Sequence, residues 1–216
     1  MHKLIIIPIV ALLSACSANL PNASNQPDVS VANSTDSKAA VKGMVVTANP
    51  HATKAGADIL RAGGSAVDAA IAIEAVLTLV EPQSSGLAGG AYMVHFHNAD
   101  NVLTVYDGRE TAPTSATETM FLNSEGESIG FLNAKNSGLS TGVPGVVSMF
   151  EMAHQDHGKL PWGMHFDQAK HLANNGFEVS PRLKNIIDRF GKYIPKTIEQ
   201  GPIDASQYFF DAKGKA

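Results

Sequence analysis

The sequence contains one cysteine, few aromatic residues and no excess of positive charge. With Cys16 as the only cysteine among 216 residues, an intrachain disulfide is excluded. The net charge of −4 argues against nucleic acid as a partner, because a nucleic-acid-binding protein needs a basic face. Aromatic residues make up 6% of the chain and hydrophobic residues 44%, so we expect a core that packs through small side chains.

The hydrophobic run near the N-terminus is short. It extends from Leu4 to Leu13 behind Lys3, whereas a membrane-spanning helix needs roughly 20 apolar residues. This pattern is typical of a secretory signal peptide. The following residues, Ser14-Ala15-Cys16, resemble the end of the lipobox of bacterial lipoproteins, in which the cysteine becomes the lipidated N-terminus. An ordinary signal peptide with an incidental cysteine is the alternative.

The whole chain therefore divides into three parts. Residues 1–15 form the predicted signal peptide, residues 16–42 a flexible tether behind the lipidated Cys16, and residues 43–216 the folded part. Serine rather than aspartate follows the cysteine, which by the same resemblance favours the outer membrane. We expect a periplasm-facing lipoprotein of the cell envelope, attached to the membrane through its lipid anchor.

The first half of the folded part predicts a strand and two helices. A β-branched run at 44–48 is typical of a buried strand. A helix should begin at Pro50 behind the N-cap Asn49 and end at Gly63-Gly64. A second helix, 66–80, has a capping box at its start and is apolar around most of its surface, so it should be buried on several sides.

The second half predicts a hairpin followed by helices. Strands at 91–97 and 102–106 are joined by a turn at 98–101. Further helices are expected near 146–156, near 166–174 and from Pro181, which Ser180 would cap. Two helices between a strand and a hairpin, with more helices behind, indicate a layered α/β or α+β domain.

Several kinds of site are absent from the sequence. The glycines at 86–90 lie between a helix and a strand, whereas a phosphate-binding loop lies between a strand and a helix. They mark instead a close approach of two backbones, or of backbone and ligand. Ser84 and Ser85 just before them have no evident base partner and are typical of a turn, and no Gly-x-Ser-x-Gly occurs. We therefore expect no catalytic nucleophile in this chain.

The eight histidines give no metal-binding pattern either. His95 and His97 share one strand face, and His154 and His157 lie one turn apart on a predicted helix. Neither pair has a third ligand at metal-binding spacing, and there is no His-Glu-x-x-His. We expect no metal.

Arg109 stands at the end of the second hairpin strand, in the stretch Leu103–Pro113, LTVYDGRETAP. An arginine forms a planar pair of hydrogen bonds with a carboxylate, which lysine cannot copy. Arg109 is therefore a candidate for binding an anionic ligand. The alternative is a salt bridge with Glu110, Asp107 or Glu81 at the strand end.

Four motifs in a fixed order now identify a family. AGGSAVDAAIA, VEPQSSGLAGG, DGRETAP and TGVPG, spread between Ala62 and Gly145, closely resemble the γ-glutamyltranspeptidase (glutathione hydrolase) family, and the resemblance extends from Gly43 to the C-terminus. It implies an N-terminal-nucleophile hydrolase with an αββα sandwich, here the N-terminal portion of the large subunit. It also implies no cofactor, and makes Arg109, within R-E-x-A-P, the residue that binds the α-carboxylate of the substrate.

The resemblance implies a reaction as well. In this family the N-terminal threonine of a small subunit, freed when the precursor cleaves itself, attacks the γ-glutamyl amide. The glutamyl group then passes to water or to an acceptor amino acid. Partners would be glutathione or other γ-glutamyl compounds, acceptor amino acids and the small subunit.

Two departures from the family pattern affect these expectations. The glycine loop reads SGLAGG followed by Ala91, where the family often has SGIGGGG. No Thr-Thr-His motif occurs, so we expect a fragment, truncated product or half of a split enzyme, with the sandwich incomplete and the chain alone inactive and prone to aggregate.

Two other functions remain open. A related cephalosporin or glutaryl acylase would bind an acyl group that also ends in a carboxylate. A non-catalytic envelope lipoprotein would bind a peptide or amino acid through Arg109.

Overall fold

The structure is a computed structural model that describes residues 43–135, 137–191 and 208–211. The predicted signal peptide, the lipidation site Cys16 and the tether lie outside these residues. Within the described part, six α-helices accompany one two-stranded antiparallel sheet, so the secondary structure is of the α+β kind. No helix there is both long enough and apolar enough to cross a membrane.

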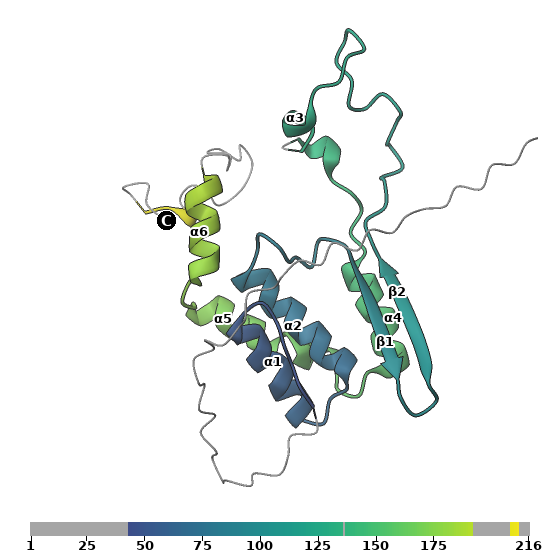
Figure 1. The fold of residues 1–216 in the computed structure, drawn as a ribbon, viewed down its shortest axis with the longest axis vertical. Coiled ribbons are helices and arrows are strands. Elements are labelled where there is room, and N and C mark those ends of the chain that lie inside the picture. The colour runs from purple at the N-terminus through teal and green to yellow at the C-terminus, as the bar shows by residue number, and fades with distance from the viewer. Residues whose placement is uncertain (1–42, 136, 192–207, 212–216) are drawn as a thin grey trace, which may run out of the picture. The chain divides into compact units, whose positions relative to one another are not determined.

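The first packed unit consists of two neighbouring, antiparallel helices, α1 (Pro50–Arg61) and α2 (Ala66–Val80) (Figure 1). Asn49 caps α1 by accepting from the backbone N–H of His51, and the predicted capping box of Ser65 and Asp68 starts α2. The structure confirms both helix starts. α2 has buried residues around much of its circumference, as its apolar sequence predicts.

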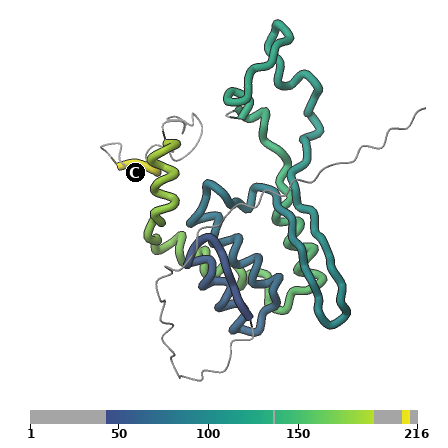
Figure 2. Tube along the Cα trace, viewed as in Figure 1, coloured from purple at the N-terminus to yellow at the C-terminus, as the bar shows by residue number. Residues whose placement is uncertain are grey.

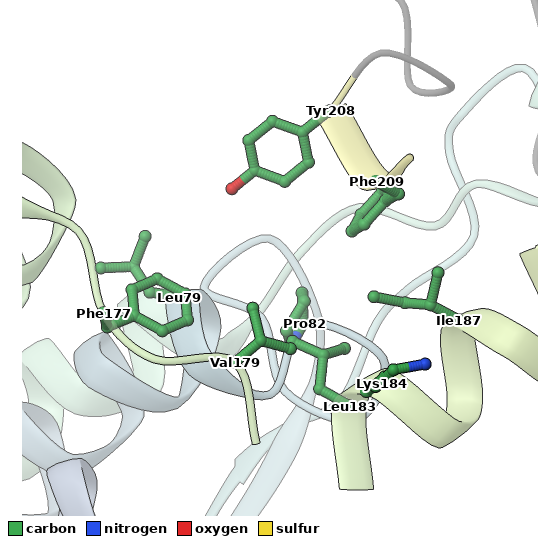
Figure 3. A pocket seen from close by; sticks show the side chains of 9 residues that line it. All are labelled: Leu79, Pro82, Phe177, Val179, Leu183, Lys184, Ile187, Tyr208 and Phe209. Atoms are coloured by element: carbon green, nitrogen blue, oxygen red, sulfur yellow. The ribbon is translucent and has the colours of Figure 1, made fainter. Parts of the chain in front are cut away.

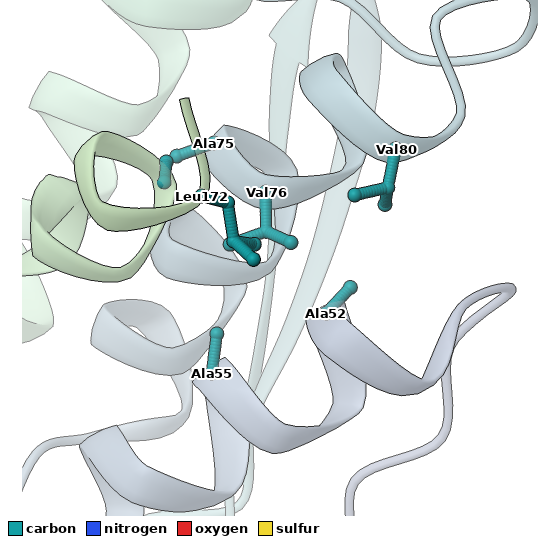
Figure 4. Close-up of a cluster of buried hydrophobic side chains, with 7 residues drawn as sticks. Ala52, Ala55, Ala75, Val76, Val80 and Leu172 are labelled. Carbon is teal, nitrogen blue, oxygen red and sulfur yellow. The ribbon is translucent and has the colours of Figure 1, made fainter. Parts of the chain in front are cut away.

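Small side chains let these helices approach closely. A Cβ at Gly56 of α1 would lie 2.7 Å from the Ile73 side chain of α2, which only glycine avoids. Around this contact α1, α2 and α5 (Asp167–Asn175) share one core cluster (Figure 4). Its buried members are Ala52, Ala55, Ala75, Val76, Val80, Ala169 and Leu172.

The predicted strand at 44–48 is not found. The segment has no strand partner among the described residues, and Met44 and Val46 are 86% and 82% exposed. Val45 instead lies against α1, near Gly56. Its β-branched residues favour an extended backbone, but a strand also needs a hydrogen-bonded neighbour.

The hairpin forms as predicted, with β1 (Ala91–His97) paired to β2 (Val102–Gly108). One face packs on α4 (Val146–His157), where Tyr106 and Met93 join a cluster with Met149 and Phe150. The opposite face is exposed. It carries Tyr92, Val94, Phe96, Leu103 and Val105, each at least half exposed.

After β2 the chain makes a long excursion before α4 begins (Figure 2). It contains a short helix, α3 (Phe131–Lys135), and a 3₁₀ turn, η1 (Gly138–Ser140), neither of which the sequence predicts. Thr111 pairs with Val143 where the excursion leaves and returns. The two ends of the excursion are therefore held together next to Arg109.

The remaining helices follow the sequence prediction closely. α4 is followed by a 3₁₀ segment, η2 (Trp162–Phe166), which leads into α5. The last helix, α6 (Pro181–Phe190), starts at Pro181 with Ser180 as its cap. An apolar pocket of about 300 Å³ lies between the end of α2, α6 and the Tyr208-Phe209 pair (Figure 3).

Candidate substrate-binding site

Arg109 follows directly on the last residue of β2. Its backbone N–H donates to the Asp107 carboxylate at 2.9 Å, which fixes the turn. Its guanidinium lies 3.2 Å from Glu110 Oε2, and its side chain is 54% exposed. The ion pair with Glu110 that the sequence allowed is therefore present. One such contact leaves most of the five guanidinium N–H donors open to solutes.

Two glycines lie close against Glu110. A Cβ at Gly90 would lie 2.2 Å from Glu110 Oε2 and 2.8 Å from its backbone nitrogen. A Cβ at Gly142 would lie 2.8 Å from the Cβ of Glu110. Of the two close approaches predicted for the 86–90 loop, the structure shows the one between two backbones, and it places the loop against the residue that pairs with Arg109.

Three of the four sequence motifs meet around this pair. Thr111 and Val143 exchange backbone hydrogen bonds of 3.2 and 2.9 Å. The carbonyl of Gly89 accepts from the N–H groups of Gly145 and Val146 at the start of α4. The glycine loop, the Arg109 segment and the Thr141–Gly145 segment are therefore tied to one another by backbone hydrogen bonds.

A cleft of about 360 Å³ opens beside Glu110. This volume is in the range of small-molecule sites. Glu74 contributes from α2 and accepts from the N–H of Gly86 at 3.0 Å. Burial raises the pKa of Glu74, and that hydrogen bond only partly offsets the rise. The cleft is lined by Glu74, Pro82, Gln83, Ser84, Ser85, Gly86, Gly89, Gly90, Ala91, Glu110 and Val146.

Ser84 and Ser85 serve the turn, as the sequence suggested. Their backbone N–H groups donate to the Glu81 carbonyl at 3.0 and 3.1 Å. The turn carries the chain from α2 into the glycine loop, so it sets one wall of the cleft.

Glu81 makes structural contacts that the sequence did not indicate. Its carboxylate is buried and accepts from Asn49 at 3.1 Å, from Ser180 at 3.2 Å, and from Gln83 and Arg182. The carboxylate thus joins the starts of α1 and α6 to the end of α2. Burial alone would raise the pKa of Glu81, but the four hydrogen bonds outweigh it and hold the pKa below its ordinary value. It is not a partner of Arg109.

The histidine pairs each gain a neighbour that the sequence did not reveal. His95 stacks on His157 with ring centroids 4.0 Å apart, across the contact of hairpin and α4. His154 meets Asp68 and His165. The spacing of the histidines in the sequence could not show these neighbours of His154, because they come from α2 and η2.

Comparison with known proteins bears on the same motifs. The sequence profile of the family described as Gamma-glutamyltranspeptidase matches residues 52–216. This chain belongs to the gamma-glutamyltranspeptidase family. It is 36% identical over 155 residues to a glutathione hydrolase proenzyme of Bacillus subtilis, which covers 72% of this chain and 26% of that protein. The chain thus spans about a quarter of the length of that relative.

Solved structures agree with the family assignment. The Helicobacter pylori gamma-glutamyltranspeptidase superposes with a TM-score of 0.72 and 31% identity, over 80% of this chain and 48% of that one. A cephalosporin acylase from Bacillus halodurans gives 0.59 and 29%, over 78% of this chain and 30% of that one. The described residues therefore have the fold of the corresponding part of gamma-glutamyltranspeptidases.

Proposed function

We propose that this chain is part of a γ-glutamyltransferase or glutathione hydrolase, and that Arg109 binds the α-carboxylate of the γ-glutamyl donor. The observation that carries the proposal is the meeting of three of the four family motifs around the Arg109–Glu110 pair, beside an open cleft that Glu110 lines. A half-exposed guanidinium on a backbone tied by hydrogen bonds suits two-pronged binding of a small carboxylate.

Glu110 would orient the guanidinium while the carboxylate of the substrate takes the free N–H donors. Binding the glutamyl head group in this way would place its far carbonyl at a fixed distance for attack. The hydroxyl oxygen of a threonine would then bond to the carbonyl carbon, the C–N bond would break, and the amine would leave with a proton. Water or an acceptor amino acid would release the glutamyl group. We place that threonine in polypeptide outside these 216 residues.

The exposed face of the hairpin supports a further protein layer. Five apolar side chains on neighbouring strands are more than a solvated sheet face normally carries. A second sheet, supplied by further polypeptide, would cover them in a sandwich. We therefore propose that the small subunit packs on this face.

We also propose that the protein is anchored at the cell envelope through Cys16. The short apolar run from Leu4 to Leu13 ahead of Ser14-Ala15-Cys16 supports this, together with the tether at 16–42, long enough to let the folded part stand clear of a membrane.

A cephalosporin or glutaryl acylase is the second candidate, favoured by the similarity to the Bacillus halodurans acylase. The experiment that separates the two compares γ-glutamyl and glutaryl p-nitroanilide as substrates of the complete precursor. Preference for the γ-glutamyl compound supports the transpeptidase, and preference for the glutaryl compound supports the acylase. Binding of glutamate without hydrolysis of either would favour a non-catalytic lipoprotein.

A further inference from the structure

A buried carboxylate and two imidazoles meet away from the cleft, at the start of α2. Asp68 Oδ1 lies 3.0 Å from His165 Nε2 and 3.5 Å from His154 Nε2. The three ligand atoms all lie within 4.8 Å of one another. Asp68 and His165 are fully buried, whereas the His154 side chain is 22% exposed and gives access from solvent.

The two distances from Asp68 Oδ1 are close to those of a tetrahedral metal site. Zinc bonds to histidine nitrogen and carboxylate oxygen at about 2.0–2.2 Å, so neighbouring ligand atoms in a tetrahedron lie about 3.3–3.5 Å apart. The two distances from Asp68 Oδ1 bracket that range. The carbonyl oxygen of Leu160 lies 2.9 Å from His154 Nε2 and accepts a hydrogen bond from that nitrogen when it is protonated.

The carboxylate is also oriented as a metal ligand would be. Its other oxygen, Oδ2, accepts from the backbone N–H groups of Ser65 at 2.7 Å, Lys159 at 2.9 Å and Leu160 at 3.3 Å. These bonds leave Oδ1 directed at the two imidazoles. Carboxylates that bind metals are held by outer hydrogen bonds of this kind.

Hydrogen bonding within the cluster leaves one group unsatisfied. His165 Nδ1 is buried without a hydrogen-bond partner. A buried polar atom without a partner costs about 1–3 kcal/mol, a cost that a leucine at this position would not incur. Nε2 of the same ring lies 3.0 Å from Asp68 Oδ1, and this hydrogen bond, or a bond from Nε2 to a cation, offsets the cost.

We propose that Asp68, His154 and His165 bind a Zn²⁺ ion, with a water molecule or the Leu160 carbonyl as the fourth ligand. The ligands come from α2, α4 and η2, so the ion would join three segments of the fold. Because the ion would tie these three segments together away from the cleft, its role is structural. The proposal does not depend on the function proposed for Arg109.

The single tryptophan of the chain reports on this site. The ring of Trp162 lies 5.3 Å from that of His154 and 6.0 Å from that of His165. Co²⁺, which replaces zinc in such sites and quenches nearby fluorescence, should quench Trp162 until one equivalent is bound. Prior addition of Zn²⁺ should prevent the quenching and raise the melting temperature. The sample is the full chain with Cys16→Ser, because this change removes the only thiol.

Two substitutions should strongly weaken Co²⁺ binding, and a third should leave it unchanged. His165→Leu and, independently, His154→Gln should weaken Co²⁺ binding by more than the roughly 10–100-fold typical of outer-shell changes. His97→Asn, in the other histidine cluster, should leave it unchanged. Circular dichroism identifies any variant that fails to fold.

A measurement on the unsubstituted histidines completes the test. Zn²⁺ should slow modification of His154 by diethyl pyrocarbonate, followed by mass spectrometry, and leave the exposed His171 unaffected. The proposal is overturned if folded chain shows no stoichiometric quenching, if quenching survives His165→Leu, if His97→Asn removes it, or if Zn²⁺ leaves His154 as reactive as before.

Discussion

Gly90 lies so close to Glu110 that a Cβ on Gly90 would come within 2.2 Å of a carboxylate oxygen and within 2.8 Å of the backbone nitrogen. The backbone nitrogen cannot move away as a flexible side chain can. The glycine is therefore required by the position of Glu110, and through Glu110 by that of Arg109.

Gly90→Ala should consequently displace the Arg109 segment. We expect a loss of about 1–3 kcal/mol in the free energy of unfolding, as for other overpacked sites, and a higher KM for the γ-glutamyl donor in the complete enzyme. Gly86→Ala is the matched control, since a Cβ there meets nothing within 4 Å. Equal effects of the two substitutions, in urea unfolding and in kinetics, would contradict this account of the loop.

Glu81 predicts a specific dependence of stability on pH. Its pKa is lower in the folded chain than the ordinary 4.5, so the folded chain binds fewer protons there than the unfolded chain. The contribution of Glu81 to the free energy of unfolding is therefore complete above its pKa in the unfolded chain. It is lost as the pH falls through its lower pKa in the folded chain. Glu81→Gln should cost about 2 kcal/mol at pH 7, since hydrogen bonds to charged groups contribute about 1.5–3 kcal/mol.

At pH 3 the difference in unfolding free energy between Glu81→Gln and the unsubstituted chain should shrink. Glu151→Gln, at an exposed position of α4, serves as the control and should have little effect at either pH. Urea titrations at both pH values measure this. A difference that stays the same at pH 3 would mean that the charge of Glu81 does not matter.

The exposed hairpin face predicts self-association of the chain alone. Val94 and Val105 face each other across the strands and are 65% and 59% exposed. Replacing both by threonine should reduce aggregation in analytical ultracentrifugation, yet weaken assembly with the small subunit. Val102→Thr, on the opposite face, should do neither. If the double variant and Val102→Thr have the same effect on aggregation and on assembly, the exposed hairpin face is not an interface.

If Cys16 is the lipid anchor, its substitution should change where the protein is located in the cell. Cys16→Ser should move the protein from the membrane fraction to the soluble periplasmic fraction and abolish labelling with palmitate. Ser17→Ala, its neighbour, should preserve both attachment and labelling. Retention of Cys16→Ser in the membrane fraction would mean that the anchor lies elsewhere.

Local signals made the helices and the hairpin predictable from the sequence. Ser65 with Asp68, and Ser180 before Pro181, mark helix starts through bonds within three residues, and the structure has both. Arg109 could be named because a strand end and a family motif coincide there. The strand expected at 44–48 failed because its β-branched pattern does not reveal whether a partner strand is present.

Contacts between distant residues were out of reach of such signals. Arg182 binds Glu81 from 101 residues away, and His165 binds Asp68 from 97 residues away. Each residue alone looks like an ordinary surface or core side chain. The partners come together only where the start of α6 meets Glu81, just after α2, and where η2 packs against α2, so the Glu81 cluster and the Asp68 cluster could not be found by spacing.

The central claim is that Arg109 binds the carboxylate of the donor, and the KM of the complete enzyme tests it most directly. Arg109→Lys keeps the positive charge but removes the planar guanidinium that can form two parallel hydrogen bonds with a carboxylate. The KM for a γ-glutamyl anilide should therefore rise about 10–100-fold, which is the equivalent of losing one charge-assisted hydrogen bond. Arg61→Lys, in a surface ion pair of α1, should leave KM unchanged. An Arg109→Lys enzyme with unaltered KM would show that this guanidinium belongs only to its salt bridge with Glu110.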